Sequence, residues 1–157
     1  YLNLDGGRIQ VQLHPVRPGP VYEDEQITVS ARYSAHLTGS FDHPKLGPQP
    51  CSGQSFSYLM EAEGKRLAFS GDLSGALRSH ALDHLREEPL DLLVMEMTHI
   101  RPDDILPVVG RMQVQEVALY HIHDPWHGEG EATLRQYCEQ HLPCPCVIAH
   151  DGDELVL

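Results

Sequence analysis

The sequence predicts one α/β domain over residues 1–157. In the first half, apolar and polar residues alternate along several segments, as they do on half-buried strands. In the second half, short continuous apolar runs alternate with amphipathic segments of helical length, an order typical of βαβ units. No internal repeat and no linker-like stretch interrupts this order. We therefore expect a single domain, or part of one.

The expected elements of the first half are strands and their connections. Strands are predicted at residues 8–16, 26–35, 54–62 and 65–72. Arg17 to Pro20 reads as a turn, and Glu63-Gly64 as the turn of a hairpin. Residues 36–53 are rich in Pro, Gly and Ser, which favours a loop. Because this loop is longer than most connections, we expect it to be functional or mobile.

The expected elements of the second half alternate between helix and strand. Helices are predicted at residues 79–88, 102–112 and 129–142, and strands at 90–98, 115–122, 146–150 and 154–157. Pro89 ends the first helix, and the second begins with a proline and two acids, as helices do. The run at 90–98 is continuously apolar, which indicates a strand buried on both faces. The last two strands flank a turn at Asp151-Gly152.

Composition limits the possible functions. The formal net charge is −12, from 23 acidic and 11 basic residues, so the overall field of the chain does not attract nucleic acid. A phosphoester substrate would need a local cation, and a bound metal ion would supply it. No apolar run approaches the ~20 residues of a membrane-spanning helix. There is no secretory signal, and the chain begins at Tyr1, not at Met, already in strand-like sequence; we therefore interpret it as a fragment or processed product.

The four cysteines predict a reducing, cytoplasmic environment. We interpret Cys51, Cys138, Cys144 and Cys146 as free thiols, with a disulfide framework as the weaker alternative. Cys144-Pro-Cys146 lacks the two-residue spacing of a zinc knuckle. It leaves open a thiol-based redox function, although no helix begins after it to lower the pKa of a thiol.

Polar residues gather where the predicted strands end. They are His36, Asp72, Glu96, His99, His121 and Asp151. Loops at one edge of an α/β sheet commonly carry binding and catalytic residues, and imidazole with carboxylate suits zinc, manganese or iron. Each residue also has an ordinary interpretation taken alone: Gly71-Asp72 as a turn, His36 as a loop residue and His121 as a partly buried imidazole.

These segments, taken in order, resemble the second half of a metallo-β-lactamase-fold hydrolase, closest to the ribonuclease Z-like branch. The segments are "GPVYEDEQITVSARYSAH", "SFSYLMEAEGKRLAFSGDL", "DLLVMEMTH", "VALYHIH" and "VIAHDGDEL". The resemblance covers nearly all of the chain and rests on their order and spacing. It implies an α/β fold, the C-terminal half of an αββα sandwich with a mixed sheet and flanking helices.

The resemblance also implies a two-metal site, most simply of zinc, with manganese or iron as alternatives. It makes His36 a ligand of the first metal, Asp72 the bridging and catalytic aspartate, and His121 a ligand of the second metal. Glu96 and His99 fall where the family has a Glu-Ala-Thr motif. Their implied catalytic role is to orient a ligand or approach the leaving group.

One family signature is missing from this chain. The His-x-His-x-Asp-His run of the first half, which supplies most metal ligands, has no match before His36. The stretch beginning at His121 reads His-x-His-Asp-x-x-His, out of register and after the Gly-Asp turn. His123 and His127 are therefore expected near the site or on the surface. His80 and His84 lie one turn apart on a predicted helix, and a solvated or rim position is expected for both.

The leading interpretation is a metal-dependent phosphodiesterase acting on RNA or a cyclic nucleotide, with this chain as its C-terminal half. The alternative is an inactive half-domain that serves as a structural or regulatory partner. Either one predicts a homo-oligomer or association with the missing half, because an incomplete sheet leaves an open edge. We expect no membrane association.

Overall fold

The computed structural model of the chain describes residues 14–34, 36–43, 47–52 and 55–157, with the backbone alone described over 38–43 and 47–52. The predicted strand at 8–16 lies mostly outside these residues, and 14–16 are not in a strand. Among the described residues, no helix is long and apolar enough to cross a membrane.

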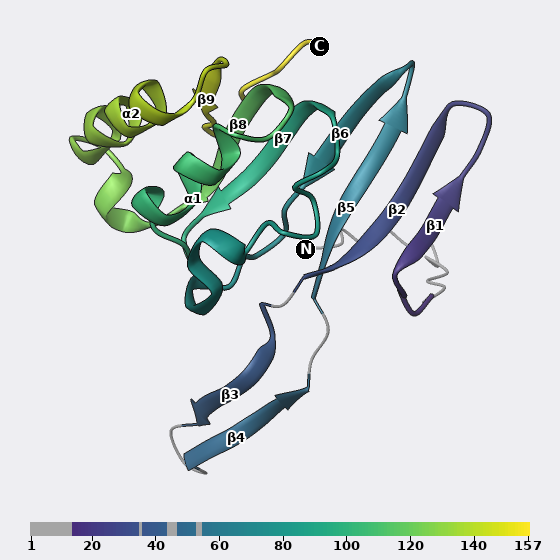
Figure 1. Ribbon diagram of the computed structural model, residues 1–157, viewed down its shortest axis with the longest axis horizontal. Coiled ribbons are helices and arrows are strands. Elements are labelled where there is room, and N and C mark those ends of the chain that lie inside the picture. The colour runs from purple at the N-terminus through teal and green to yellow at the C-terminus, as the bar shows by residue number, and fades with distance from the viewer. Residues whose placement is uncertain (1–13, 35, 44–46, 53–54) are drawn as a thin grey trace, which may run out of the picture.

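A mixed sheet forms the centre of the fold (Figure 1). Its strands are β1 (Gly19–Glu23), β2 (Ile27–Ser34), β5 (Ser55–Ala62), β6 (Lys65–Phe69), β7 (Leu90–Met97), β8 (Val114–Ile122) and β9 (Cys146–Ile148), in the spatial order β1-β2-β5-β6-β7-β8-β9. Pairing is antiparallel from β1 to β6 and parallel from β6 to β9. The predicted change from consecutive strands to βαβ-like units is therefore confirmed as a mixed α/β sheet.

The helices pack on one face of this sheet (Figure 1). They are α1 (Pro102–Val109) and α2 (Gly130–His141), with the 3-10 turns η1 (Gly75–His80) and η2 (Asp124–Trp126). Leu93 and Met95 of β7 and Leu119 of β8 are fully buried beneath them, in one core with Ile105 and Leu134 of the helices. Burial of such side chains, worth about 1.5–3 kcal/mol each, holds the two layers together.

The opposite face of the sheet is also apolar. Directly paired residues on this face include Val29–Met60, Ala31–Tyr58, Tyr33–Phe56, Met60–Leu67, Tyr58–Phe69, Leu67–Leu92, Phe69–Val94, Val94–Ala118 and Ala118–Val147. Most of these side chains are half-buried, and Tyr33 is 40% exposed. None of the helices in the described part of the chain covers this face. An apolar face of this kind is what a sheet presents to a second packed layer in a sandwich.

The predicted loop at 36–53 is wrong. Its described parts form a two-stranded antiparallel hairpin, β3 (Thr38–His43) and β4 (Gly47–Ser52), which projects from the sheet (Figure 1). Pro and Gly are depleted in strands, so composition favoured a loop. Pro48 and Pro50 are two positions apart, and their backbone nitrogens therefore face the same edge. Proline has no backbone N–H, so it fits a strand where its nitrogen faces away from the partner strand. In a two-stranded ribbon this outer edge carries no ladder hydrogen bond, and the missing N–H costs nothing there.

The predicted helix at 79–88 is also wrong. The segment forms successive turns with i to i+3 hydrogen bonds, from Ala81 N to Arg78 O and from Leu85 N to Leu82 O. Arg78 has φ 48° and ψ −122°, which breaks any continuous helix at its start. Leu82 and Leu85 are fully buried, whereas Leu77, just before this segment, is 37% exposed. The burial of these two leucines in the core therefore has more influence on the backbone conformation of residues 79–88 than the helical spacing of the sequence.

The remaining differences are at element ends. β1 occupies part of the predicted turn at 17–20, and α1 ends at Val109, before the predicted residue 112. Residues 154–157 are exposed and not in a strand, because no neighbouring strand pairs with them in the described structure. The hairpin across Glu63-Gly64 is confirmed, with φ 51° and 76° at the two turn residues. Such positive angles are those of the type I′ turns that join tightly paired strands.

Candidate metal centre

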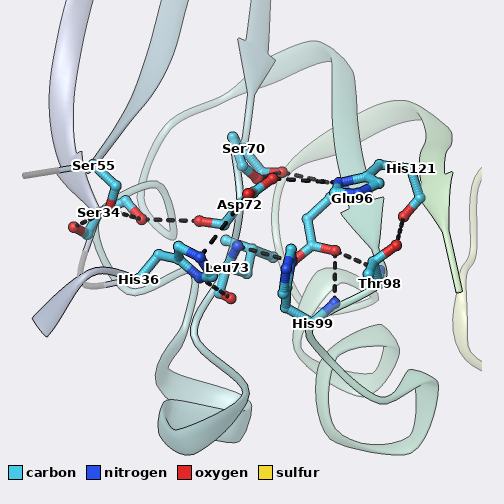
Figure 2. A network of polar contacts seen from close by, with 11 residues as sticks. Ser34, His36, Ser55, Ser70, Asp72, Leu73, Glu96, Thr98, His99 and His121 are labelled. Atoms are coloured by element: carbon cyan, nitrogen blue, oxygen red, sulfur yellow. Dashed lines mark hydrogen bonds and ion pairs between the residues drawn. The ribbon is translucent and has the colours of Figure 1, made fainter. Parts of the chain in front are cut away.

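Side chains from four segments meet at one edge of the sheet (Figure 2). His36 follows β2, Asp72 follows β6, Glu96 and His99 lie at the end of β7, and His121 lies near the end of β8. β6, β7 and β8 are parallel, and β2 runs in the same direction because two antiparallel pairings separate it from β6. All four carboxyl ends therefore reach the same edge, the usual place for a site in an α/β sheet.

Gly71 sets the position of Asp72. Its φ is +58°, and an added Cβ would lie 2.6 Å from the carbonyl oxygen of Phe56. Only glycine accepts this combination of left-handed backbone and close approach without strain. Ser34 Oγ donates to the Asp72 carbonyl oxygen at 3.2 Å, which ties the turn to the end of β2. The Ser-Gly-Asp sequence thus forms a tight turn that directs the carboxylate of Asp72 into the site.

Glu96 organises the loops on both sides of the site. Its side chain is fully buried. Oε1 accepts hydrogen bonds from Leu73 N at 2.8 Å and His99 Nδ1 at 3.2 Å, while Oε2 accepts from Thr98 N and from His99 N at 2.9 Å. A buried carboxylate with four donors is fully satisfied. Glu96 therefore fixes the loop after β7, the loop after β6 and the ring of His99 relative to one another (Figure 2).

His121 reaches the site through a β-bulge. Glu96 pairs with Tyr120 and Met97 pairs with Ile122, so His121 is an extra residue in β8. Its φ is +46°, a left-handed conformation that is uncommon outside glycine. The Thr98 hydroxyl donates to its carbonyl oxygen and stabilises the bulge. Bulges turn a side chain away from the regular alternation of a strand, and here the imidazole turns toward Asp72.

Asp72 lies between two imidazoles. Its Oδ1 is 3.3 Å from His121 Nδ1, and its Oδ2 is 3.9 Å from His36 Nε2. His36 Nδ1 donates to the Leu73 carbonyl oxygen at 2.8 Å, which leaves Nε2 as the free lone pair on the side of Asp72. The ring of His99 stands between the other two, with centroids 4.7 Å from His36 and 5.4 Å from His121.

These donors fit a metal ion. Ligand atoms of His36, Asp72 and His99 lie within 4.8 Å of one another, and so do those of Glu96, His99 and His121. His36 and His99 each donate Nδ1–H to an oxygen, the outer-shell bond that orients metal-binding histidines and leaves Nε2 to coordinate. A set of imidazole nitrogens and carboxylate oxygens suits zinc, with manganese or iron also compatible.

The structure brings together the five residues expected in the metal site: His36, Asp72, Glu96, His99 and His121. His99 lies in both candidate ligand sets, so its position suits a metal ligand as well as the predicted catalytic role. Asp151, the sixth strand-end residue, belongs to neither candidate ligand set; together with His121 it lines a cavity of about 640 Å³. His80, His123 and His127 are exposed, as predicted. His84 is not at the rim; it is half-buried, with Nε2 2.6 Å from Ser57 Oγ.

Sequence reasoning missed the supporting residues. Ser34, Ser70 and Thr98 brace the site through hydroxyl contacts with backbone. Burial raises the pKa of the Tyr120 phenol, and the nearby carboxylates of Asp72 and Glu96 raise it further. Serine and threonine at strand ends are too common to signal a site. Only the Ser-Gly-Asp turn pointed to Ser70.

Comparison with known proteins identifies the fold of this chain. No family model and no curated protein matches the sequence. Among solved structures, the metallo-β-lactamase fold protein YhfI from Bacillus subtilis matches 85% of this chain with a TM-score of 0.59 and 14% identity. Yeast PDE1 matches 87% with a TM-score of 0.60 and 14% identity. The short form of human tRNase Z matches 84% with a TM-score of 0.50 and 18% identity.

The chain has a metallo-β-lactamase fold. It spans about half the length of these structures, 50% of YhfI, 48% of PDE1 and 42% of tRNase Z. The predicted fold class, an α/β metallo-β-lactamase fold with a mixed sheet and flanking helices, is confirmed. At these identities the likeness establishes the fold, and a fold hosts many activities.

Proposed function

We propose that this chain supplies one half of a metal-dependent hydrolase that cleaves a phosphodiester such as RNA or a cyclic nucleotide. The observation that carries the proposal is the meeting of His36, Asp72, His99 and His121 at one sheet edge, with their ring nitrogens and carboxylate oxygens facing one another. These groups come from four segments that are distant in sequence. A surface loop rich in histidine would not produce that convergence.

Each residue has a distinct role in this proposal. His36 and His121 would each hold one ion, and Asp72 would bridge the two, because its two oxygens face the two histidines separately. A metal pair supplies a hydroxide nucleophile near neutral pH and positive charge for the phosphoryl oxygens. Glu96 keeps the ring of His99 in one orientation, with Nε2 as its free nitrogen.

His99 has two roles compatible with its position. As a ligand it would complete the set around His36 or His121. As a catalytic acid it would donate a proton from Nε2 to the leaving oxygen. Substitution separates the two: His99→Ala that loses metal supports the ligand role, whereas a variant that keeps metal but loses turnover supports the acid role.

The cavity beside His99 carries charged side chains of both signs. Arg78 and Arg101 line a cavity of about 310 Å³ that His99 also borders, in a chain of net charge −12. Asp103 and Asp104 lie on the same cavity, with Arg101 4.0 Å from Asp103. The two arginines and the two aspartates balance in charge, so positive charge for an anionic substrate would come from the bound metal ions. Two of the structurally similar proteins carry the names tRNase Z and PDE1, which supports a phosphodiester.

A second candidate function is that of a non-catalytic half-domain, favoured by the apolar second face of the sheet. In this function the chain would associate through that face with another subunit or with the missing half. Both functions predict an assembly larger than the monomer. Light scattering after size-exclusion chromatography measures the assembly, and a strictly monomeric protein would argue against the face as an interface.

Metal content separates the two functions. We would purify the protein without added metal, measure zinc, manganese and iron per chain, and repeat the measurement on His121→Asn. Asparagine adopts positive φ more readily than most residues, so backbone strain is small. His123→Ala, which removes an exposed histidine two positions away, is the control. Metal in the wild type and control that is lost in His121→Asn supports the hydrolase. No metal in the wild type, even after incubation with zinc, overturns metal binding by this chain alone, and the proposed activity would then belong only to a longer protein.

A further inference from the structure

Two cysteine sulfurs lie in contact away from the metal centre. Cys138 of α2 and Cys146 of β9 have their Sγ atoms 3.3 Å apart. Both are free thiols, Cys138 with only 4% of its surface exposed and Cys146 half-buried. Cys144 is also free and half-buried. The predicted free thiols are confirmed at these three positions; the side chain of Cys51 lies outside the described residues.

The contact is suited to oxidation. The Cys146 thiol donates to Cys138 Sγ, which lowers the pKa of Cys138 and raises that of Cys146. Of the two sulfurs, Cys138 therefore ionises more readily, and the thiolate is the reactive form. A disulfide has its sulfurs about 2.0 Å apart. The two sulfurs already lie in van der Waals contact, because α2 packs against β9.

We propose that Cys138 and Cys146 form a reversible disulfide when the protein meets a hydroperoxide. The Cys138 thiolate attacks one peroxide oxygen and becomes a sulfenic acid, releasing hydroxide. Cys146 then attacks the Cys138 sulfur and water leaves. Overall, two thiols and one hydrogen peroxide give one disulfide and two water molecules, so the thiols are oxidised by two electrons and the peroxide is reduced.

The position of this pair gives the disulfide a structural consequence. It would join α2 to β9, and the residues directly after β9 include Ala149, His150 and Asp151, which line the cavity next to His121. Glu131 of α2 lies 3.2 Å from His150 through Oε2 and Nε2. A covalent link between the two elements would restrict the wall of that cavity.

The test uses the whole chain, reduced and then freed of reductant. It is treated with hydrogen peroxide, denatured, alkylated and measured by mass spectrometry. We expect the intact mass to fall by two hydrogens, two alkylation sites to disappear, and dithiothreitol to restore both. Cleavage at Glu139 separates Cys138 from Cys144 and Cys146, so the disulfide appears as two linked peptides.

Matched variants identify the partner of Cys138. Cys144→Ser and Cys146→Ser make the same change two residues apart, both at half-buried positions. We expect the link to persist in Cys144→Ser and to vanish in Cys146→Ser. Fragmentation of the wild-type linked peptides assigns the sulfur even if a variant fails to fold. A link through Cys144, a link between two chains, or oxidation of single cysteines to sulfinic acid without a link would each overturn the proposal.

Discussion

Replacing Glu96 with glutamine tests the central support of the candidate site. The change keeps the shape of the side chain and replaces one carboxylate oxygen with an NH₂ group. Each oxygen of Glu96 accepts two hydrogen bonds, from Leu73 N and His99 Nδ1 on one side and from Thr98 N and His99 N on the other. Whichever way the amide is oriented, its NH₂ group faces two N–H donors.

The expected change in the free energy of unfolding follows from the two hydrogen bonds that the substitution removes. Glu96 is fully buried, so water does not replace them. A hydrogen bond to a charged group contributes about 1.5–3 kcal/mol, and a buried donor left unpaired carries a desolvation penalty. We therefore expect Glu96→Gln to lower the free energy of unfolding by about 3–5 kcal/mol, a large share of the about 5–15 kcal/mol typical of a domain.

Urea unfolding followed by circular dichroism at constant pH measures this change. Glu61→Gln is the matched control, because it makes the same substitution on an exposed β5 side chain that forms a surface ion pair with Arg66. The control should stay within about 1 kcal/mol of the wild type. If Glu96→Gln changes stability no more than the control does, Glu96 is not the buried acceptor of four hydrogen bonds described above.

Two further predictions concern backbone strain and pH. Gly71→Ala and Gly128→Ala both place alanine at a φ near +58° (+58° and +57°), but only the Cβ at Gly71 meets a backbone oxygen. In urea unfolding, we expect Gly128→Ala to lower the free energy of unfolding by about 1–2 kcal/mol because of the left-handed backbone. Gly71→Ala should lower it clearly more. Equal losses of stability in the two variants would contradict the close approach of Gly71 to Phe56. Burial lowers the pKa of His84 below its ordinary 6.5, so below pH 6.5 the unfolded chain binds a proton that the folded chain does not. Stability of the wild type should therefore fall as pH drops from 6.5 toward the folded pKa. His84→Gln should show a shallower fall over that window, and parallel pH profiles would argue against a neutral, buried His84.

Much of the sheet could be predicted from local patterns. Alternation over 26–35 and 54–62 gave β2 and β5, and the continuous apolar run at 90–98 gave β7, because period and burial are encoded within a few residues. The hairpin at Glu63-Gly64 followed from turn chemistry. The helix prediction at 79–88 failed because Leu82 and Leu85 are buried by contact with the core, in a backbone that helix propensity does not favour. The loop prediction at 36–53 failed because the placement of the prolines of β4 at an outer edge depends on pairing between strands.

The sequence alone determined the order of strands and helices, the polar residues at the strand ends, and the acidic charge that makes a local cation necessary for an anionic substrate. Each of these depends on residue type and short-range spacing. Tertiary structure alone decided that His99 stands between His36 and His121, that a bulge turns His121 toward Asp72, and that Cys138 meets Cys146. These relations depend on strand register and on the packing of α2 against the sheet. Such contacts join residues far apart in the chain, and local spacing carries no information about them.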